Sequence, residues 1–300
     1  MKKIIMAIAC GVLAAGIGFA TVGCGGSGGT EIVVFNRESG SGTRDAFIEI
    51  LGIEATELYA GAAQHSSTSA VVKAVAGDAN GIGYISLGSL DNTVKALSVD
   101  GVAPSETTVA NGTYKVARPF ELMYQTNNNS DLLAGFLSYM QSEEAQATIA
   151  DEGYVSIRSD ASAYVVPTEQ FKDPNLDISG STSVGPLMEI LAEDYKALIK
   201  EKLGQDIEIS VGEGGSGKGI ENAESGTSDI GMASKEVTAA DFNDGSKMTI
   251  LQLCSDGIAV IVNPANSVTN ITRDALKAIY TGETTAWEDI EGWVAPVEEE

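Results

Sequence analysis

Short apolar runs in this chain alternate with polar, glycine-rich loops and with segments of helical spacing. Residues 33–47 give the pattern most fully. Their first three residues are strand formers. The loop that follows contains Gly40 and Gly42, which let the backbone turn sharply, and Thr43 can cap a helix. The stretch predicts a strand, a loop and a helix, and taken alone it is most simply a capped helix after a surface turn.

The same strand–loop–helix order returns at residues 176–189, at 207–220 and, more weakly, at 229–236. Each loop is rich in Ser, Thr or Gly. Ligands of open α/β sheets bind at the carboxyl ends of strands, and a helix start presents free N–H groups that favour anions. Converging loops of this kind predict a cage of donors for an oxyanion, to which Arg37 and Arg44 would add charge.

The rest of the pattern predicts further helices and strands around these loops. Helices are expected at 70–76, 132–150 and 271–280, and the helix after 185 is expected to run to about 202. Extended segments are expected at 82–85, 94–99, 114–124 and 251–262, the last as a strand pair or as one long strand. Residues 59–68 and 101–112 are predicted loops, and 160–177 is predicted to be a linker.

Composition favours an α/β protein of about two domains. The chain has 300 residues, 43% hydrophobic content, 34 glycines and few aromatic residues, which suits real cores and many tight strand-to-helix turns. Its formal net charge is −24, so nucleic acid and anionic lipid surfaces are poor partners. An anionic ligand would have to be held by local donors against this unfavourable field.

The start of the chain predicts export. Met1-Lys2-Lys3 and the apolar run from 4 to 22 have the pattern of a secretory signal, here assigned to residues 1–23, with a membrane-spanning helix as the alternative. The following Cys24 resembles the lipidated cysteine of a bacterial lipobox, although Thr21 stands where Leu or Val is usual. Residues 24–30 would form a flexible tether. We therefore expect an extracytoplasmic protein anchored to the cell membrane by lipid alone.

The few Cys and His residues argue against disulfides, thiolate metal sites and a Ser-His-Asp triad. Cys10 would leave with the signal and Cys24 would carry lipid, so only Cys254 remains, most simply as a small buried residue. No disulfide and no thiolate metal site is then expected, and the acidic residues lack metal-ligand spacing. The single histidine, His65, lies in a polar loop with no sign of a Ser-His-Asp triad. We expect neither a metal nor a cofactor.

Glycine motifs offer competing interpretations. Residues 212–218 have Walker A spacing up to Lys218, but Gly219 follows where a Ser or Thr should hold Mg²⁺. The same glycines fit a dinucleotide G-x-G-x-x-G, which is a weak signal in a chain so rich in glycine. Neither Ser216 nor Ser41 has the two flanking glycines of a nucleophile elbow. A nucleotide-using or phosphatase-like enzyme is the alternative from a different functional class.

Several motifs together resemble one known family, the substrate-binding proteins (PstS family) of the high-affinity phosphate ABC transporter. They cover nearly the whole chain after the signal, and they are the stretches 36–47, 71–88, 95–104, 117–119, 152–155, 179–188, 214–220, 229–234 and 256–264. The resemblance implies a non-enzymatic protein that binds inorganic phosphate and delivers it to permease subunits. Alternatives within the same class are a sulfate- or molybdate-binding protein and a phosphate sensor.

The order of these motifs differs from that of the family, and the chain resembles a circularly permuted member. The resemblance implies the two-lobed α/β fold of type II periplasmic binding proteins. One lobe, lobe I, would comprise 116–260, and lobe II would comprise 31–115 plus 261–300. The crossovers between lobes would lie near 114–118 and 261–264, and the family's usual termini would be joined through 158–177.

The resemblance also implies the phosphate contacts, residue by residue. From lobe II they are Arg37, Ser41, Gly42 and Thr43; from lobe I they are Thr182, Ser183, Gly215, Ser216 and Ser234. Ser234 stands where well-known members place an aspartate that accepts the phosphate proton. Another acceptor would then be needed to discriminate against sulfate, and Glu38 and Asp256 are the candidates.

Overall fold

The computed structural model describes residues 30–295. The predicted signal peptide, Cys24 and nearly all of the predicted tether lie outside these residues. None of the helices in the described part combines the length and the apolar character needed to cross a membrane.

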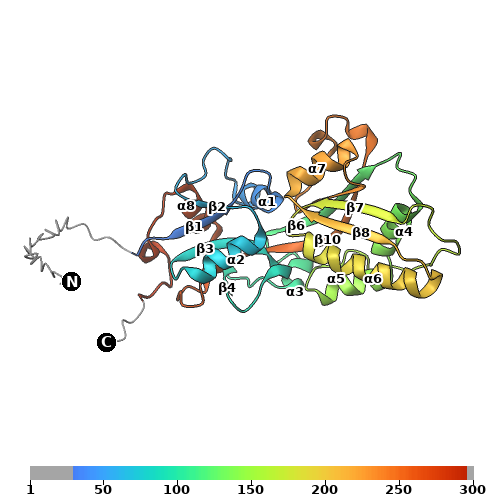
Figure 1. The fold of residues 1–300 in the computed structure, drawn as a ribbon. Coiled ribbons are helices and arrows are strands. Elements are labelled where there is room, and N and C mark those ends of the chain that lie inside the picture. Colours follow the sequence, from blue (N-terminus) through green and yellow to red (C-terminus); the bar gives the residue numbers. More distant parts are fainter. Residues whose placement is uncertain (1–29, 296–300) are drawn as a thin grey trace, which may run out of the picture.

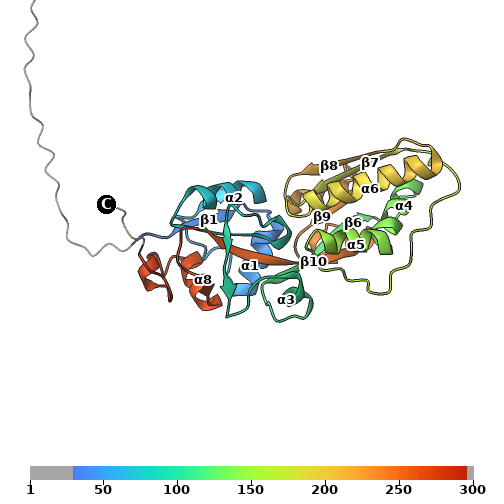
Figure 2. The same cartoon turned by 90° about the horizontal axis from the view of Figure 1, so that it is seen from below.

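Two lobes lie side by side and share one long strand (Figures 1 and 2). The strands are β1 (Val33–Arg37), β2 (Ala63–His65), β3 (Gly81–Ser86), β4 (Lys95–Ala96), β5 (Ser98–Val99), β6 (Ala117–Gln125), β7 (Asn175–Gly180), β8 (Glu208–Glu213), β9 (Ile230–Ala233), β10 (Met248–Val262) and β11 (Asn270–Ile271). The helices are α1 (Gly42–Leu51), α2 (Thr68–Gly77), α3 (Glu106–Ala110), α4 (Asp131–Met140), α5 (Glu143–Asp151), α6 (Gly185–Leu203), α7 (Ser216–Ser225) and α8 (Arg273–Thr281).

Strand β10 connects the lobes. The main sheet runs in the order β2-β1-β3-β10-β6-β9-β7-β8. The first part of β10, residues 248–257, pairs antiparallel with β6, and the second part, residues 258–262, pairs antiparallel with β3. The segment 251–262, predicted as a strand pair or one long strand, is thus part of a single strand. Because β10 belongs to both halves, this internal strand joins the two lobes.

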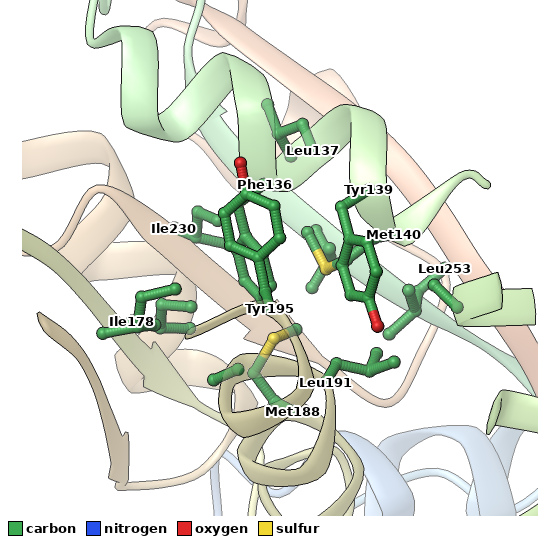
Figure 3. Close-up of a cluster of buried hydrophobic side chains, with 14 of the residues drawn as sticks. Phe136, Leu137, Tyr139, Met140, Ile178, Met188, Leu191, Tyr195, Ile230 and Leu253 are labelled. Carbon is green, nitrogen blue, oxygen red and sulfur yellow. The ribbon is translucent and has the colours of Figure 1, made fainter. Parts of the chain in front are cut away.

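The core of lobe I is formed by side chains from residues 120–254. Figure 3 shows Phe136 and Tyr139 of α4 packed against Tyr195 of α6, with ring centroids 5.3 and 5.0 Å from that of Tyr195. Met188 and Leu191 lie on the same face of α6 and are fully buried. This packing fixes α6, whose N-terminal end faces the other lobe (Figure 1).

The cores of lobe II take their side chains from two separate parts of the chain, residues 32–116 and 258–290. Phe47 of α1 stacks on Tyr84 of β3 with a centroid distance of 4.0 Å. Because an aromatic pair of this kind favours a defined offset, it sets the position of α1 on the sheet. The start of α1, which carries Thr43, is positioned in turn.

Some predicted elements needed correction. The stretch 132–150 is two helices rather than one, because Ser142 accepts a hydrogen bond from the Ala145 amide at 3.4 Å and starts α5. The predicted loop at 101–112 contains α3, and the one at 59–68 contains the edge strand β2. The strand expected at 94–99 is divided into β4 and β5, which pair with different partners.

Candidate anion-binding site

Four helix starts meet where the lobes face each other. Helices α1 and α2 follow β1 and β2 of lobe II, and α6 and α7 follow β7 and β8 of lobe I. The lobes touch here directly, because the Gly217 amide of α7 donates to the Gly40 carbonyl at 2.9 Å. Figure 1 shows α1 and α7 facing each other across this boundary. The predicted convergence is present for the loops after β1, β7 and β8. The strand–loop–helix predicted at 229–236 is wrong in its last part, because no α-helix follows β9 within these described residues, and α2 provides the fourth helix start.

A cluster of buried hydroxyls lies at the meeting point. Thr43 Oγ1 is 2.9 Å from Ser183 Oγ and 3.2 Å from Ser234 Oγ. Ser216 Oγ is 3.4 Å from Ser234 Oγ, and Thr68 Oγ1 is 3.0 Å from Ser183 Oγ. All five residues are at most 4% exposed. We call these residues, together with Arg37, Thr182 and Ser181, the hydroxyl cage.

Arg37 brings the cage its positive charge from the end of β1. Its guanidinium forms a two-point ion pair with Glu38, with Nε 2.8 Å from Oε2 and Nη2 2.9 Å from Oε1. Nη2 also donates to Thr182 Oγ1 across the lobes at 3.1 Å, and Nη1 donates to Thr68 Oγ1 at 3.4 Å. The residue is only 2% exposed, so its charge acts in a poorly solvated setting, where electrostatic attraction is strong.

The predicted contact residues occupy different positions around the cage. Arg37, Thr43, Thr182, Ser183, Ser216 and Ser234 place their side chains in it. Gly42 lies against it, since a β-carbon there would be 2.3 Å from Ser216 Oγ. The Ser41 hydroxyl instead accepts from the Arg44 amide at 3.3 Å and caps α1. Gly215 starts α7 with a φ of +88°, a conformation that favours glycine.

Neither suggested proton acceptor is a free carboxylate. Glu38 is occupied by Arg37 as described. Asp256 Oδ2 lies 2.9 Å from Arg118 Nη1, and both side chains are almost fully buried. Burial raises the pKa of Asp256, and the neighbouring Arg118 opposes this shift. The cage itself consists of hydroxyls, amides and one guanidinium.

Three cage or neighbouring residues were missed from the sequence. Thr68 follows β2, which is too short and polar to be recognised as a strand, although Ser67-Thr68 before a helix repeats the loop signal. Ser181 donates to Ser234 Oγ at 2.9 Å and was passed over beside Thr182. Arg118 lies in an extended segment away from any glycine loop. It belongs to the family-like stretch 117–119, but nothing in that stretch marked it as a site residue.

An open cavity of about 690 Å³ borders the cage between α2 and the start of α6. Thr68 and Thr182 line both the cavity and the cage, and Lys73 adds a cationic side chain to the cavity wall. The cavity therefore adjoins the cage at these two residues. Among residues 30–295, no group of three or more His, Cys, Asp or Glu side chains is arranged to hold a metal.

Two α/β lobes that share a connecting strand and oppose their helix starts define a two-lobed solute-binding protein, and the predicted fold class is confirmed. A model of the PBP superfamily domain matches residues 21–144 and 165–299. A phosphate-binding protein, PstS 2 of Streptococcus pneumoniae TIGR4, is 38% identical over 287 residues, covering 91% of this chain and 94% of that protein. The chain therefore belongs to the PstS family of phosphate-binding proteins.

Further comparisons agree with this assignment. A crystal structure of a phosphate-binding protein of a phosphate ABC transporter, also from Streptococcus pneumoniae TIGR4, aligns with a TM-score of 0.68 and 37% identity. The alignment covers 87% of this chain and 100% of that one. PstS of Bacillus subtilis strain 168 is 34% identical over a shorter stretch of 129 residues, which is 42% of each chain.

Proposed function

We propose that this protein captures inorganic phosphate between its lobes and delivers it to the permease of an ABC transporter. The observation that carries the proposal is the buried hydroxyl cage, to which both lobes contribute and which includes one arginine. Helix starts and hydroxyls suit a tetrahedral oxyanion, and a guanidinium matches its oxygens well. Membership of the PstS family supports phosphate as that oxyanion. The protein would act by binding alone, without enzymatic turnover.

Phosphate would take over hydrogen bonds that cage residues now make to one another. Thr43, Ser183, Ser216 and Ser234 each present a hydroxyl, and Arg37 Nη2 would turn from Thr182 to a ligand oxygen. Ser41 and Thr182 flank these groups, and Gly42 and Gly215 would offer backbone amides close to the ligand. Because the donors come from both lobes, they meet only when the lobes are closed. Phosphate would therefore shift an equilibrium between open and closed forms.

The expected free energies are compatible with tight binding. A micromolar dissociation constant needs about 8 kcal/mol. A hydrogen bond to a charged group contributes about 1.5–3 kcal/mol. Half a dozen such bonds exceed the requirement, and the remainder can offset desolvation and lobe closure.

Isothermal titration of phosphate into ligand-free protein tests the proposal. Phosphate bound during expression would first be removed by unfolding, dialysis and refolding. We expect one site per chain and a dissociation constant in the micromolar range or below. X-ray scattering of the same samples should give a smaller radius of gyration with phosphate. Absence of heat and of compaction would contradict the proposal.

Sulfate is the second candidate ligand, because neither suggested proton acceptor, Glu38 or Asp256, is a free carboxylate. Phosphate near neutral pH carries a proton and sulfate does not, so a carboxylate acceptor would favour phosphate. With Ser234 in place, sulfate should compete measurably in a displacement titration, and Ser234→Asp should reduce that competition. Preference for sulfate or molybdate over phosphate in the unmodified protein would make one of them the ligand.

Export and anchoring are part of the proposal. The signal pattern at 1–23 and the lipobox-like cysteine support attachment of the mature chain to the outer face of the membrane through Cys24. Metabolic labelling with palmitate should mark the unmodified chain, and Cys24→Ala should abolish the label. Labelling that persists in this variant would contradict the assignment.

We also propose that the segment order is a circular permutation within the family. The alignment to the pneumococcal relative spans nearly all of both chains, which supports a shared order in that relative. The match to the Bacillus protein covers only 42% of each chain, as expected if only one of two exchanged segments aligns at a time. The lobe assignment, 116–260 for lobe I and 31–115 with 261–300 for lobe II, belongs to this proposal.

A further inference from the structure

A second buried arginine stands beside the hydroxyl cage, outside every Ser/Thr/Gly loop. Arg118 lies near the start of β6 and is 4% exposed. It is opposite Asp256 in the antiparallel pairing of β6 with β10, and its Nη1 is 2.9 Å from Asp256 Oδ2. Both residues thus belong to the strands that connect the lobes. The charge of Arg118 is therefore fixed to this connection rather than to one of the cage loops.

Two further donors of Arg118 reach one residue from each side of the cage. Nε donates to the Ser234 carbonyl at 2.7 Å, and Nη2 donates to Thr43 Oγ1 at 3.0 Å. Ser234 follows β9 in lobe I, and Thr43 is at the start of α1 in lobe II. A single guanidinium therefore ties the connecting strands to both halves of the cage.

The direction of these bonds restricts the Thr43 hydroxyl. A guanidinium can only donate, and a hydroxyl has one proton and two lone pairs. Because Arg118 occupies a lone pair of Thr43 Oγ1, the Thr43 proton points elsewhere. The neighbours that remain are Ser183 Oγ at 2.9 Å and Ser234 Oγ at 3.2 Å, both inside the cage. An anion bound there would meet Thr43 as a donor.

We propose that Arg118 is a positioning residue of the anion site, which orients the Thr43 hydroxyl as a donor and holds the Ser234 loop in register. This inference rests on the proposed phosphate function. Asp256 would keep the buried guanidinium paired and correctly rotated, since an unpaired buried charge is costly. The competing role is an ion pair that only stabilises the connection between the lobes.

Phosphate titrations of matched variants separate the two roles. Asp256→Asn takes the counterion away but leaves the Arg118 bonds to Thr43 and Ser234, so it should weaken phosphate less than the double variant described next. Arg118→Gln combined with Asp256→Asn removes both charges, so no unpaired charge stays buried. This double variant should lower phosphate affinity by about 10- to 100-fold. Thermal unfolding without phosphate reports the stability of each variant. Arg273→Gln with Asp100→Asn, an exposed pair, is the control and should leave affinity unchanged.

A double-mutant cycle that combines Thr43→Val with the Arg118 and Asp256 changes measures their coupling in phosphate affinity. A purely structural role of Arg118 predicts no such coupling. In the unmodified background Thr43→Val should weaken phosphate about tenfold. In the Arg118→Gln/Asp256→Asn background its effect should fall to threefold or less, because the hydroxyl is no longer oriented. An equal effect in both backgrounds, or full affinity in the Arg118→Gln/Asp256→Asn variant, would overturn the inference.

Arg118→Lys replaces the Arg118→Gln/Asp256→Asn variant in this test if that double variant does not fold. Lysine keeps the charge beside Asp256, but a compact ammonium cannot reproduce the planar fork that reaches Thr43 and Ser234 together. It should weaken phosphate at least tenfold, and full affinity in this variant would overturn the inference. Loss of phosphate binding by the unmodified protein would overturn the proposed function, and this inference with it. Normal binding by the unmodified protein and undiminished binding by the variants would overturn this inference alone.

Discussion

At the residue scale, the cage combines many hydroxyls with a single well-placed arginine. Neutral hydroxyls can turn to suit a ligand, whereas the guanidinium supplies a fixed charge. Arg37 already carries Glu38 as a counterion, so its charge is partly compensated before any anion arrives. Removing the arginine would therefore leave the glutamate carboxylate unpaired beside the ligand.

Arg37→Ala should weaken phosphate about 100-fold, near 3 kcal/mol, because it removes a charged donor and leaves Glu38 to repel the anion. Isothermal titration gives the affinity directly. Arg273→Ala is the control, since its side chain is 45% exposed and bridges only to Asp100. An affinity for phosphate equal to that of the control would show that Arg37 is not a ligand contact.

Gly42 permits the close approach of the lobes. The β-carbon of Gly42→Ala would fall 2.3 Å from Ser216 Oγ and 2.9 Å from Ser216 Cβ, so the closed form should be destabilised while the separate lobes fold normally. We expect phosphate affinity to fall at least tenfold and the ligand-free melting temperature to change little. Gly77→Ala, where a β-carbon meets nothing within 4 Å, is the matched control. Compaction by phosphate in Gly42→Ala would refute the steric argument.

The sequence predicted the kind of site better than it predicted which residues form the site. A Ser/Thr/Gly loop after a strand predicts the start of a helix. Thr43, Thr182 and Ser216 lie in such loops, so this local pattern indicates where they are. Arg118 obeys no local rule, because its contacts depend on the pairing of β6 with β10, more than a hundred residues away in the chain. Thr68 was hidden for a related reason: β2 is short and becomes a strand only through its pairing with β1.

At the element scale, periodicity identified most strands and helices but not their breaks. The apolar positions of α4 and α5 continue in almost the same phase, so the sequence suggests one helix. Its interruption depends on Ser142, whose side chain satisfies an amide at the start of α5. The single strand β10 was also ambiguous, because its two parts pair with different partners and only the folded sheet makes them continuous.

The Ser142 cap can be tested by stability alone. Ser142→Ala leaves the Ala145 amide without its side-chain acceptor and should cost about 1 kcal/mol, lowering the melting temperature by about 2–4 °C. Phosphate affinity should not change, because α5 lies away from the cage. Ser138→Ala, on the exposed side of α4, is the comparison. If both variants melt at the same temperature, the cap contributes nothing to stability.

At the scale of the whole molecule, the two ends of the described chain lie in the same lobe (Figure 1). The Ile32 amide donates to the Thr285 carbonyl at 2.8 Å, and the Trp287 amide donates to the Thr30 carbonyl at 2.9 Å. On the other side of the molecule, the irregular stretch after Arg158 leads from α5 to β7 and is exposed around Thr168. The contacts between elements can thus be kept when the segments of the two lobes are connected in a different order along the chain.

A recut chain tests this independence of order. Residue 295 would be joined to residue 30 by a short Gly/Ser linker, and new ends would be opened between Thr168 and Glu169, which are both exposed. The cut keeps Tyr164 bonded to Tyr195 at 2.8 Å and keeps Phe171 in the core of lobe I. Since chains tolerate new ends at exposed loops, we expect a soluble protein with phosphate affinity within about threefold of the parent.

A cut inside α6, between Leu191 and Ala192, is the control and should prevent folding because both residues are buried. If the recut chain folds but loses phosphate, the connection through 158–174 has a role in closing the lobes that the static contacts do not predict.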